Sequence, residues 1–168
     1  MNTLPPPLGS GAFLAWRLDR AVYKAGWDSG EGAYRYGGRW NRSGLRAVYC
    51  ALDPATATLE VAVHIGFEAL DRVPHVLTAL AIPEPSAIHV VEPNTLDPAW
   101  LRPGLPDNEQ QAFGDGLLKT HDFIAIPSAV SRHSWNLVFD STRAKHRYTM
   151  ELQEAFVLDP RLHTSAKR

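Results

Sequence analysis

The sequence has little cysteine, little net charge and no long apolar run, and each shortage excludes a class of protein. Cys50 is the one cysteine in 168 residues, so an internal disulfide and a cysteine-based zinc site are excluded. The sequence has 17 Lys and Arg residues and 18 Asp and Glu residues, whereas proteins that bind nucleic acid through its phosphates usually carry a basic excess. No stretch approaches the ~20 apolar residues of a membrane-spanning helix. We therefore expect neither direct nucleic-acid binding nor membrane binding.

Signals for metal binding and for secretion are missing as well. The 7 histidines show no His-Glu-x-x-His motif or other metal-ligand spacing, so we expect no metal ion. The first eleven residues lack the basic and apolar regions of a secretory signal, which predicts a cytoplasmic protein. The length is that of one domain. We expect a flexible, Pro-, Gly- and Ser-rich arm at residues 1–12, a domain at 13–160 and a tail at 161–168.

Most apolar runs are short and mix β-branched or aromatic residues with nearby turn residues, which predicts strands. The expected strands cover residues 13–18, 47–52, 76–82, 88–91, 123–126, 136–139 and 154–158. Asp53 as N-cap, Pro54 at the first helical position and Gly66 as a stop predict a helix over 54–65. Strands outnumber helices without alternating regularly with them. The expected fold class is therefore α+β with a mainly antiparallel, curved sheet.

A second helix is expected at about residues 107–119, with Asp107 or Asn108 as its cap. Gly114 and Gly116 lie inside it, and each is expected to weaken it by roughly 1 kcal/mol.

Residues 32–44 form the most unusual segment, because three aromatic residues, three arginines and four glycines occur in thirteen positions. Glycine allows a backbone to approach a ligand closely, arginine matches phosphate oxygens and aromatic faces stack on bases. This composition suits a nucleotide that carries a diphosphate. A Gly-rich hairpin with exposed arginines and a core tryptophan is the other interpretation. Neither a P-loop nor a Gly-x-Gly-x-x-Gly motif is present.

Glu60 lies midway along the first predicted helix, among largely apolar neighbours, so its carboxylate needs a partner. His64 follows one helical turn later, and a surface pair between the two is one interpretation. The other is a carboxylate that faces a cleft, accepts a hydrogen bond from a sugar hydroxyl and stabilises a cationic transition state.

Three serines follow a predicted strand at every third position, namely Ser128, Ser131 and Ser134. No Gly-x-Ser-x-Gly motif surrounds them, so none is expected to be a hydrolase nucleophile. They are expected either to donate hydrogen bonds to a ligand or to cap the loop. Cys50 lies in an apolar run and is expected to be a buried structural thiol.

A set of short motifs follows a fixed order along the chain. The set comprises Trp16-Arg17, Tyr36-Gly37-Gly38-Arg39-Trp40-Asn41, Gly44, Val48-Tyr49, Leu59-Glu60 and Pro127-Ser128. With these residues the chain resembles the RES domain, a family named for its arginine, glutamate and serine. The resemblance spans roughly residues 13–158.

That resemblance implies a fold, a co-substrate and a partner. RES domains are the toxin half of bacterial toxin–antitoxin pairs, and the cognate antitoxin carries an Xre-like helix-turn-helix. The family is similar to ADP-ribosyltransferases, with a split, mostly antiparallel sheet and NAD+ in the cleft between its halves. Its members consume NAD+ by hydrolysis, by phosphorolysis or by ADP-ribosylating phosphoribosyl pyrophosphate synthetase. The implied function is NAD+ cleavage at the nicotinamide–ribose bond with transfer of ADP-ribose to a protein acceptor.

The resemblance also implies roles for individual residues. Glu60 and Arg39 are the expected catalytic residues, with Glu60 at the ribose 2′-hydroxyl and at the positive charge that develops on the ribose. Arg17 and Arg39 are expected to bind the pyrophosphate or the nicotinamide-side ribose. Tyr49 is expected to stack on nicotinamide.

Further ligand contacts are expected from three other residues. Tyr36 and Trp40 are secondary stacking candidates, and Ser128 is the serine expected to hydrogen-bond a ribose or a phosphate. Ser131 and Ser134 are alternatives to it.

The acceptor is left open by the sequence. Thr58 occupies the position two residues before Glu60, where enzymes that modify arginine often have a carboxylate or Gln, which disfavours arginine as acceptor. Transfer to a protein, hydrolysis by water and phosphorolysis remain alternatives within the enzyme interpretation. A module that binds a nucleotide without catalysis remains an alternative to it.

Overall fold

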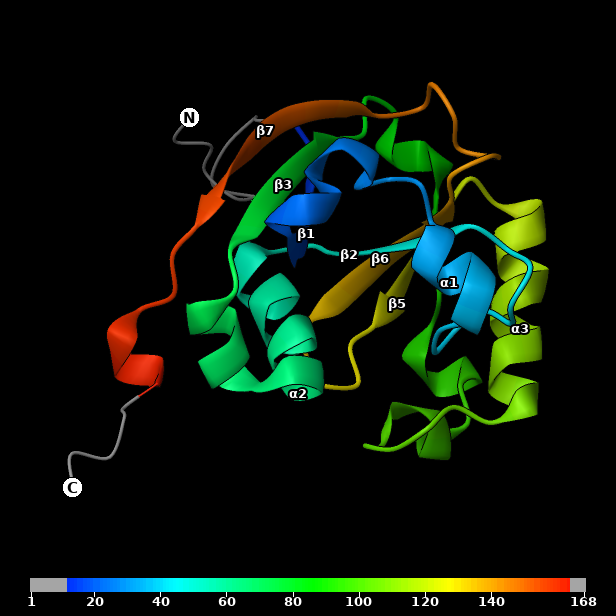
Figure 1. The fold of residues 1–168 in the computed structure, drawn as a ribbon. Coiled ribbons are helices and arrows are strands. Elements are labelled where there is room, and N and C mark those ends of the chain that lie inside the picture. The colour runs from blue at the N-terminus through cyan, green and yellow to red at the C-terminus, as the bar shows by residue number, and fades with distance from the viewer. Residues whose placement is uncertain (1–11, 164–168) are drawn as a thin grey trace.

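Turn residues interrupt the apolar runs, so the strands are short. Within residues 12–163, which the computed structural model describes, the strands are β1 (Leu14–Arg20), β2 (Ala47–Ala51), β3 (His75–Ala81), β4 (Ile88–Val90), β5 (Phe123–Pro127), β6 (Trp135–Asp140) and β7 (Thr149–Phe156). They form one sheet in the order β4-β5-β6-β2-β1-β3-β7, with β7 at one edge (Figure 1). Only the pair β4–β5 is parallel among these strands. The predicted α+β class with a mostly antiparallel sheet is confirmed.

Local capping explains where the two longer helices begin. The α-helices within the described residues are α1 (Glu31–Tyr36), α2 (Pro54–Arg72) and α3 (Asn108–Thr120). The side chains of Asp53 and Asp107 each accept a hydrogen bond of 2.7 Å, from the backbone N–H of Thr56 and Gln110 respectively, as N-cap residues do. Gly66, with φ 78° and ψ 157°, interrupts α2 where the sequence predicts its end, and a further helical segment follows to residue 72.

Two further elements, α1 and β7, differ from the prediction. Helix α1 was not predicted, because it is only six residues long and contains a glycine. Strand β7 begins at residue 149 and not at 154, since its first five residues are largely exposed and lack an apolar run. All but one residue of the predicted arm, and most of the predicted tail, lie outside the described residues.

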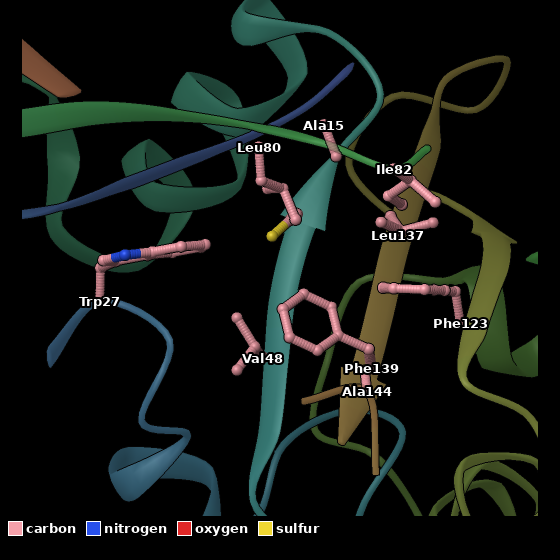
Figure 2. Close-up of a cluster of buried hydrophobic side chains, with 10 residues drawn as sticks. Ala15, Trp27, Val48, Leu80, Ile82, Phe123, Leu137, Phe139 and Ala144 are labelled. Carbon is pink, nitrogen blue, oxygen red and sulfur yellow. The ribbon is translucent and has the colours of Figure 1, made fainter. Parts of the chain in front are cut away.

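Alternation along the strands divides the core between the two faces of the sheet. One face carries the cluster around Phe123 and Phe139, whose rings pack edge to face at 5.5 Å between centroids (Figure 2). The neighbouring residues Ile124 and Val138 point to the other face and pack with Leu118 of α3. Because every member of these layers is apolar, burial of nonpolar surface is what holds the sheet between them.

Helix α2 covers the other end of that second face. Ala62 and Leu70 of α2 cluster with Leu18 of β1, which lies on the opposite face from Ala15 and therefore on the same face as α3. Figure 1 shows α2 at the β1 end of the sheet and α3 at the β5–β6 end. The two helices thus pack on different strands of this face, α2 on β1 and β2 and α3 on β5 and β6.

Candidate active site

A cavity borders strands β1 and β2 and helix α2, and its volume of about 680 Å³ is within the range of typical ligand sites. Its wall includes Arg17 of β1, Tyr49 of β2 and Glu60 of α2, together with a short loop of residues 37–41 that we call the glycine loop. The cavity therefore brings together residues from Trp16 to Asn136, which are 120 positions apart in the chain.

The cavity exists because β1 and β2 diverge. The two strands are paired only between Trp16 and Ala51, which leaves β2 backbone groups without a strand partner. The guanidinium of Arg17 donates through Nη1 to the Tyr49 carbonyl oxygen at 2.8 Å and so supplies the bond that a neighbouring strand would otherwise make. The predicted split in the sheet corresponds to this divergence, and a side chain bridges it.

Arg17 also forms a two-point contact with Asp19, at 2.6 Å from Nε and 3.0 Å from Nη2. Burial raises the pKa of Asp19, and the adjacent Arg17 charge and hydrogen bond oppose that rise only in part. Three donor atoms of Arg17 are thereby committed to the protein.

Glu60 is held from one side. Its Oε1 accepts hydrogen bonds from Ser128 Oγ at 2.7 Å and from Asn136 Nδ2 at 2.8 Å. Among the described residues no donor bonds its Oε2, and Glu60 lines the cavity. The hydrogen bonds therefore match the interpretation of a carboxylate at a cleft and not that of a surface pair with His64.

The direction of the Ser128 hydroxyl follows from its neighbours. Its oxygen accepts the backbone N–H groups of Val130 and Ser131, each at 3.1 Å, so its single proton points to Glu60. Ser128 is 1% exposed and lies behind Glu60, outside the described cavity lining. Ser131 and Ser134 bond to each other at 2.8 Å. A ligand contact by Ser128 stays a prediction.

The glycine loop is held by hydrogen bonds within the protein. The Tyr49 hydroxyl donates to Asn41 Oδ1 at 2.7 Å and accepts the backbone N–H of Trp40 at 3.0 Å. A Cβ on Gly38 would lie 2.6 Å from that hydroxyl, so only glycine fits there. Burial raises the pKa of Tyr49 above its ordinary value. The hydroxyl is therefore a neutral structural donor, and only the ring is left for a ligand.

Arg39 lines the cavity and connects the glycine loop to the segment of residues 100–104. Its Nη1 and Nη2 donate to the carbonyl oxygens of Trp100 and Gly104 at 3.1 and 3.0 Å. Trp40 also borders the cavity but is 1% exposed and packs against Trp100 and Phe113. The structure thus places most of the Trp40 ring in the core.

Tyr36 lies at the rim of the cavity and is 83% exposed. Six of the seven residues predicted to form the site therefore surround one cavity, and the seventh, Ser128, lies directly behind one of them, Glu60. Sequence reasoning missed Asn136 and the exposed Leu105, which also border the cavity. An asparagine at the start of an apolar strand is a weak signal for Asn136, since strands are poor in asparagine.

Other chemistry is limited in the described part of the chain. Burial raises the pKa of the Cys50 thiol to about 12, so it is the inert, buried thiol that the sequence predicts. Residues 12–163 hold no group of three or more His, Cys, Asp and Glu side chains placed to bind a metal ion. No helix in that range has both the length and the apolar character needed to span a bilayer.

Residues 14–159 match the model of the RES domain family. The chain belongs to the RES domain family. The resemblance seen in the sequence is thereby confirmed. A protein named Toxin Res from Photorhabdus laumondii subsp. laumondii is 31% identical over 158 residues, which cover 92% of this chain and 99% of that protein. A second Toxin Res, from Yersinia enterocolitica, is 42% identical over 52 residues, 31% of this RES chain and 34% of that protein.

Two further proteins are similar to this RES domain. A Sphingobium protein named Prs ADP-ribosylating toxin is 35% identical over 89 residues, which cover 51% of this chain and 55% of that protein. The crystal structure of the M. tuberculosis MbcT–MbcA toxin–antitoxin complex contains a chain that matches with a TM-score of 0.68 and 18% identity, over 88% of this chain and 85% of that one. At that identity the structural match shows a shared fold.

Proposed function

We propose that this RES domain is the toxin of a toxin–antitoxin pair, and that it cleaves NAD+ at the nicotinamide–ribose bond and transfers the ADP-ribose to a protein. The observation that carries the proposal is the Glu60 carboxylate, which borders a ligand-sized cavity with one oxygen held by two donors and the other left over for a substrate. The names of the relatives, a Prs ADP-ribosylating toxin among them, support the same class of reaction.

The chemistry needs a negative charge in that place. When the bond from ribose C1′ to the pyridinium nitrogen breaks, its electron pair leaves with nicotinamide, which departs as a neutral molecule. Positive charge then develops on the ribose, as in glycoside cleavage. A preoriented carboxylate stabilises that charge, and its neighbouring oxygen accepts the 2′-hydroxyl. Because the leaving group needs no proton, one carboxylate suffices where glycosidases use two. The acceptor then bonds to C1′ and releases its proton to solvent.

Arg17 and Arg39 are unequal candidates for the diphosphate. Arg17 already uses three of its donor atoms on Asp19 and on the Tyr49 carbonyl oxygen. Arg39 uses two, both on the backbone carbonyl oxygens of Trp100 and Gly104. A guanidinium has five N–H donors. We therefore assign the diphosphate first to Arg39. We assign to Arg17 the task of bridging the diverging strands β1 and β2 at the cavity.

The aromatic residues fit the two rings of the dinucleotide. The ring of Tyr49 lies in the cavity wall, where nicotinamide would stack during bond cleavage, and the exposed Tyr36 at the rim is suited to the adenine. Trp40 supports the wall from behind, since its ring is almost wholly buried.

A protein is the acceptor we propose, with phosphoribosyl pyrophosphate synthetase as the first one to test because of the name of the Sphingobium relative. The hydroxyl of Thr58 bonds to the Pro54 carbonyl oxygen of its own helix at 2.9 Å and is outside the described cavity lining. Nothing at this position orients an arginine, which favours another acceptor side chain.

The test is release of nicotinamide from NAD+ by the purified chain, in water, in phosphate and in cell extract. Glu60→Gln keeps the shape and removes the charge, and we expect release to fall by about a hundredfold. Glu68→Gln is the matched control, because Glu68 is on the same helix but is exposed and paired with Arg72. Full activity of the Glu60 variant would contradict the proposed role. Absence of nicotinamide under all three conditions would favour a module that only binds a nucleotide.

Isotope-labelled NAD+ separates the acceptors. Label on a protein band in extract supports transfer to a protein, whereas label that stays in small molecules would show hydrolysis or phosphorolysis. The antitoxin is tested by expression: growth should stop when this chain is expressed alone and resume when its Xre-like neighbour is co-expressed.

A further inference from the structure

Asn136 is a polar residue of the cavity wall to which the proposed function gives no role of its own. It lies at the start of β6, is 8% exposed, and borders the cavity. Its Nδ2 donates to Glu60 Oε1 at 2.8 Å. Its Oδ1 is buried and has no hydrogen-bond partner in residues 12–163.

The carboxylate determines which way this amide lies. A rotated amide would place Oδ1 against Glu60 Oε1, and two acceptors would then face each other with no proton between them. The observed orientation therefore satisfies the carboxylate and leaves the amide oxygen unsatisfied. Among the described residues, the bond to Glu60 is the one hydrogen bond of the Asn136 side chain, so it is the main polar contribution of that side chain.

We propose that Asn136 is a positioning residue, which fixes the orientation of the Glu60 carboxylate together with Ser128. The terminal torsion of a glutamate side chain has a broad energy profile, so a carboxylate held by one donor can still rotate. Two donors that reach the same oxygen from different segments, β6 and the loop after β5, remove that freedom. The second oxygen then keeps one place relative to the substrate, which is the condition for preorganised electrostatic stabilisation.

Asn136 is better suited to a test than Ser128. Ser128 also accepts two backbone N–H groups, so its removal disturbs the loop as well as Glu60. The Oδ1 of Asn136 accepts no bond from the described residues. Truncation to alanine therefore leaves none of their donors without its acceptor. We expect Asn136→Ala to fold with an unchanged thermal midpoint. Asn94→Ala, on an exposed turn, is the matched control for the same substitution.

The kinetic arm rests on the proposed function. We expect Asn136→Ala to lower kcat for nicotinamide release by roughly ten- to a hundredfold, with KM for NAD+ nearly unchanged. Asn136→Asp, which has the same shape but repels the carboxylate, should lower kcat further. In a Glu60→Gln background, Asn136→Ala should have little additional effect, because the two residues act as one unit. An equal loss in both backgrounds, or a raised KM with an unchanged kcat, would overturn the proposal.

A crystal structure of Asn136→Ala separates this inference from the proposed function, since it needs no turnover. We expect the Glu60 carboxylate to adopt more than one orientation while the rest of the site keeps its geometry. A carboxylate that stays in place on Ser128 alone would overturn the positioning role even if NAD+ is the substrate. If the wild-type chain releases no nicotinamide, the proposed function fails and this structural comparison still decides the role of Asn136.

Discussion

The glycine loop and the Glu60 cluster, which consists of Glu60, Ser128 and Asn136, both contribute to one cavity and are built in different ways. In the loop, the side chain of Asn41 forms hydrogen bonds within the protein, one of them with the hydroxyl of Tyr49 on β2, which also bonds the Trp40 N–H. In the cluster, two donors converge on one oxygen of a carboxylate and its second oxygen is left over among the described residues. Apart from Arg39, the loop therefore provides shape, whereas the cluster provides a negative charge that a substrate can use.

This difference separates stability from activity. Loop substitutions should lower both, because the loop is part of the packed structure and its buried groups lose their partners. Substitutions in the cluster should act first on the reaction. The following predictions test that contrast, from the largest expected effect to the smallest.

Gly114→Ala in α3 should have the largest effect on the loop. A Cβ there would lie 2.0 Å from the Trp40 carbonyl oxygen, and neither backbone can move aside cheaply. We expect the free energy of unfolding to fall by about 3 kcal/mol, with activity lost in parallel, as measured by urea unfolding. Gly116→Ala is the matched control, since its Cβ would meet nothing within 4 Å. It should stabilise the chain by about 1 kcal/mol. Equal effects at both positions would mean that close packing of α3 at Gly114 does not hold the glycine loop in place.

Tyr49→Phe should cost about 2 kcal/mol of unfolding free energy. The change removes one hydroxyl and leaves both Asn41 Oδ1 and the Trp40 N–H without their partner. Activity should fall mainly through a higher KM, because the loop loses its fixed position. Tyr23→Phe, at an exposed tyrosine, is the control in the same urea titration. A Tyr49 variant as stable as the control would show that this hydroxyl does not hold the loop.

Ser128→Ala should lower both the stability and the activity, the stability by less than Tyr49→Phe does. Two backbone N–H groups lose their acceptor, which should cost about 1 kcal/mol of stability. Nicotinamide release should fall about tenfold because Glu60 loses one donor. Both quantities are measured on one preparation, beside Asn136→Ala. Loss of stability with full activity would place Ser128 with the loop and not with the cluster.

Glu31→Gln should have the smallest effect, since this partly exposed residue of α1 belongs to neither region. Hydrogen bonds from Arg46 and then Arg35 lower the pKa of Glu31 from its ordinary value of 4.5. A lowered pKa means that the ion pairs stabilise the fold above that ordinary value, and that the stabilisation is lost as the pH falls through the lowered one. The variant should therefore melt slightly below wild type at neutral pH and equally in acid. A difference that persists in acid would rule out a charge effect.

The sequence predicted the cavity better than it predicted the tasks of the residues around it. Arg17, Arg39, Tyr49 and Glu60 were expected at one ligand site, and all four border one cavity. Their individual roles remain predictions. The structure adds that Arg17 and Tyr49 also bridge the diverging strands and hold the loop, through bonds to partners far along the chain. Composition reveals which chemistry a residue offers but not which neighbour will use it.

By itself the sequence determined what is local: the starts of α2 and α3, the break at Gly66 and most of the short strands. These features depend on neighbours within about one helical turn, such as Asp53 and the N–H of Thr56. Only the tertiary structure decided that Ser128 and Asn136, 68 and 76 positions away, reach the same oxygen of Glu60. It also distinguished Gly114 from Gly116, because the backbone that lies against one and not the other comes from the glycine loop.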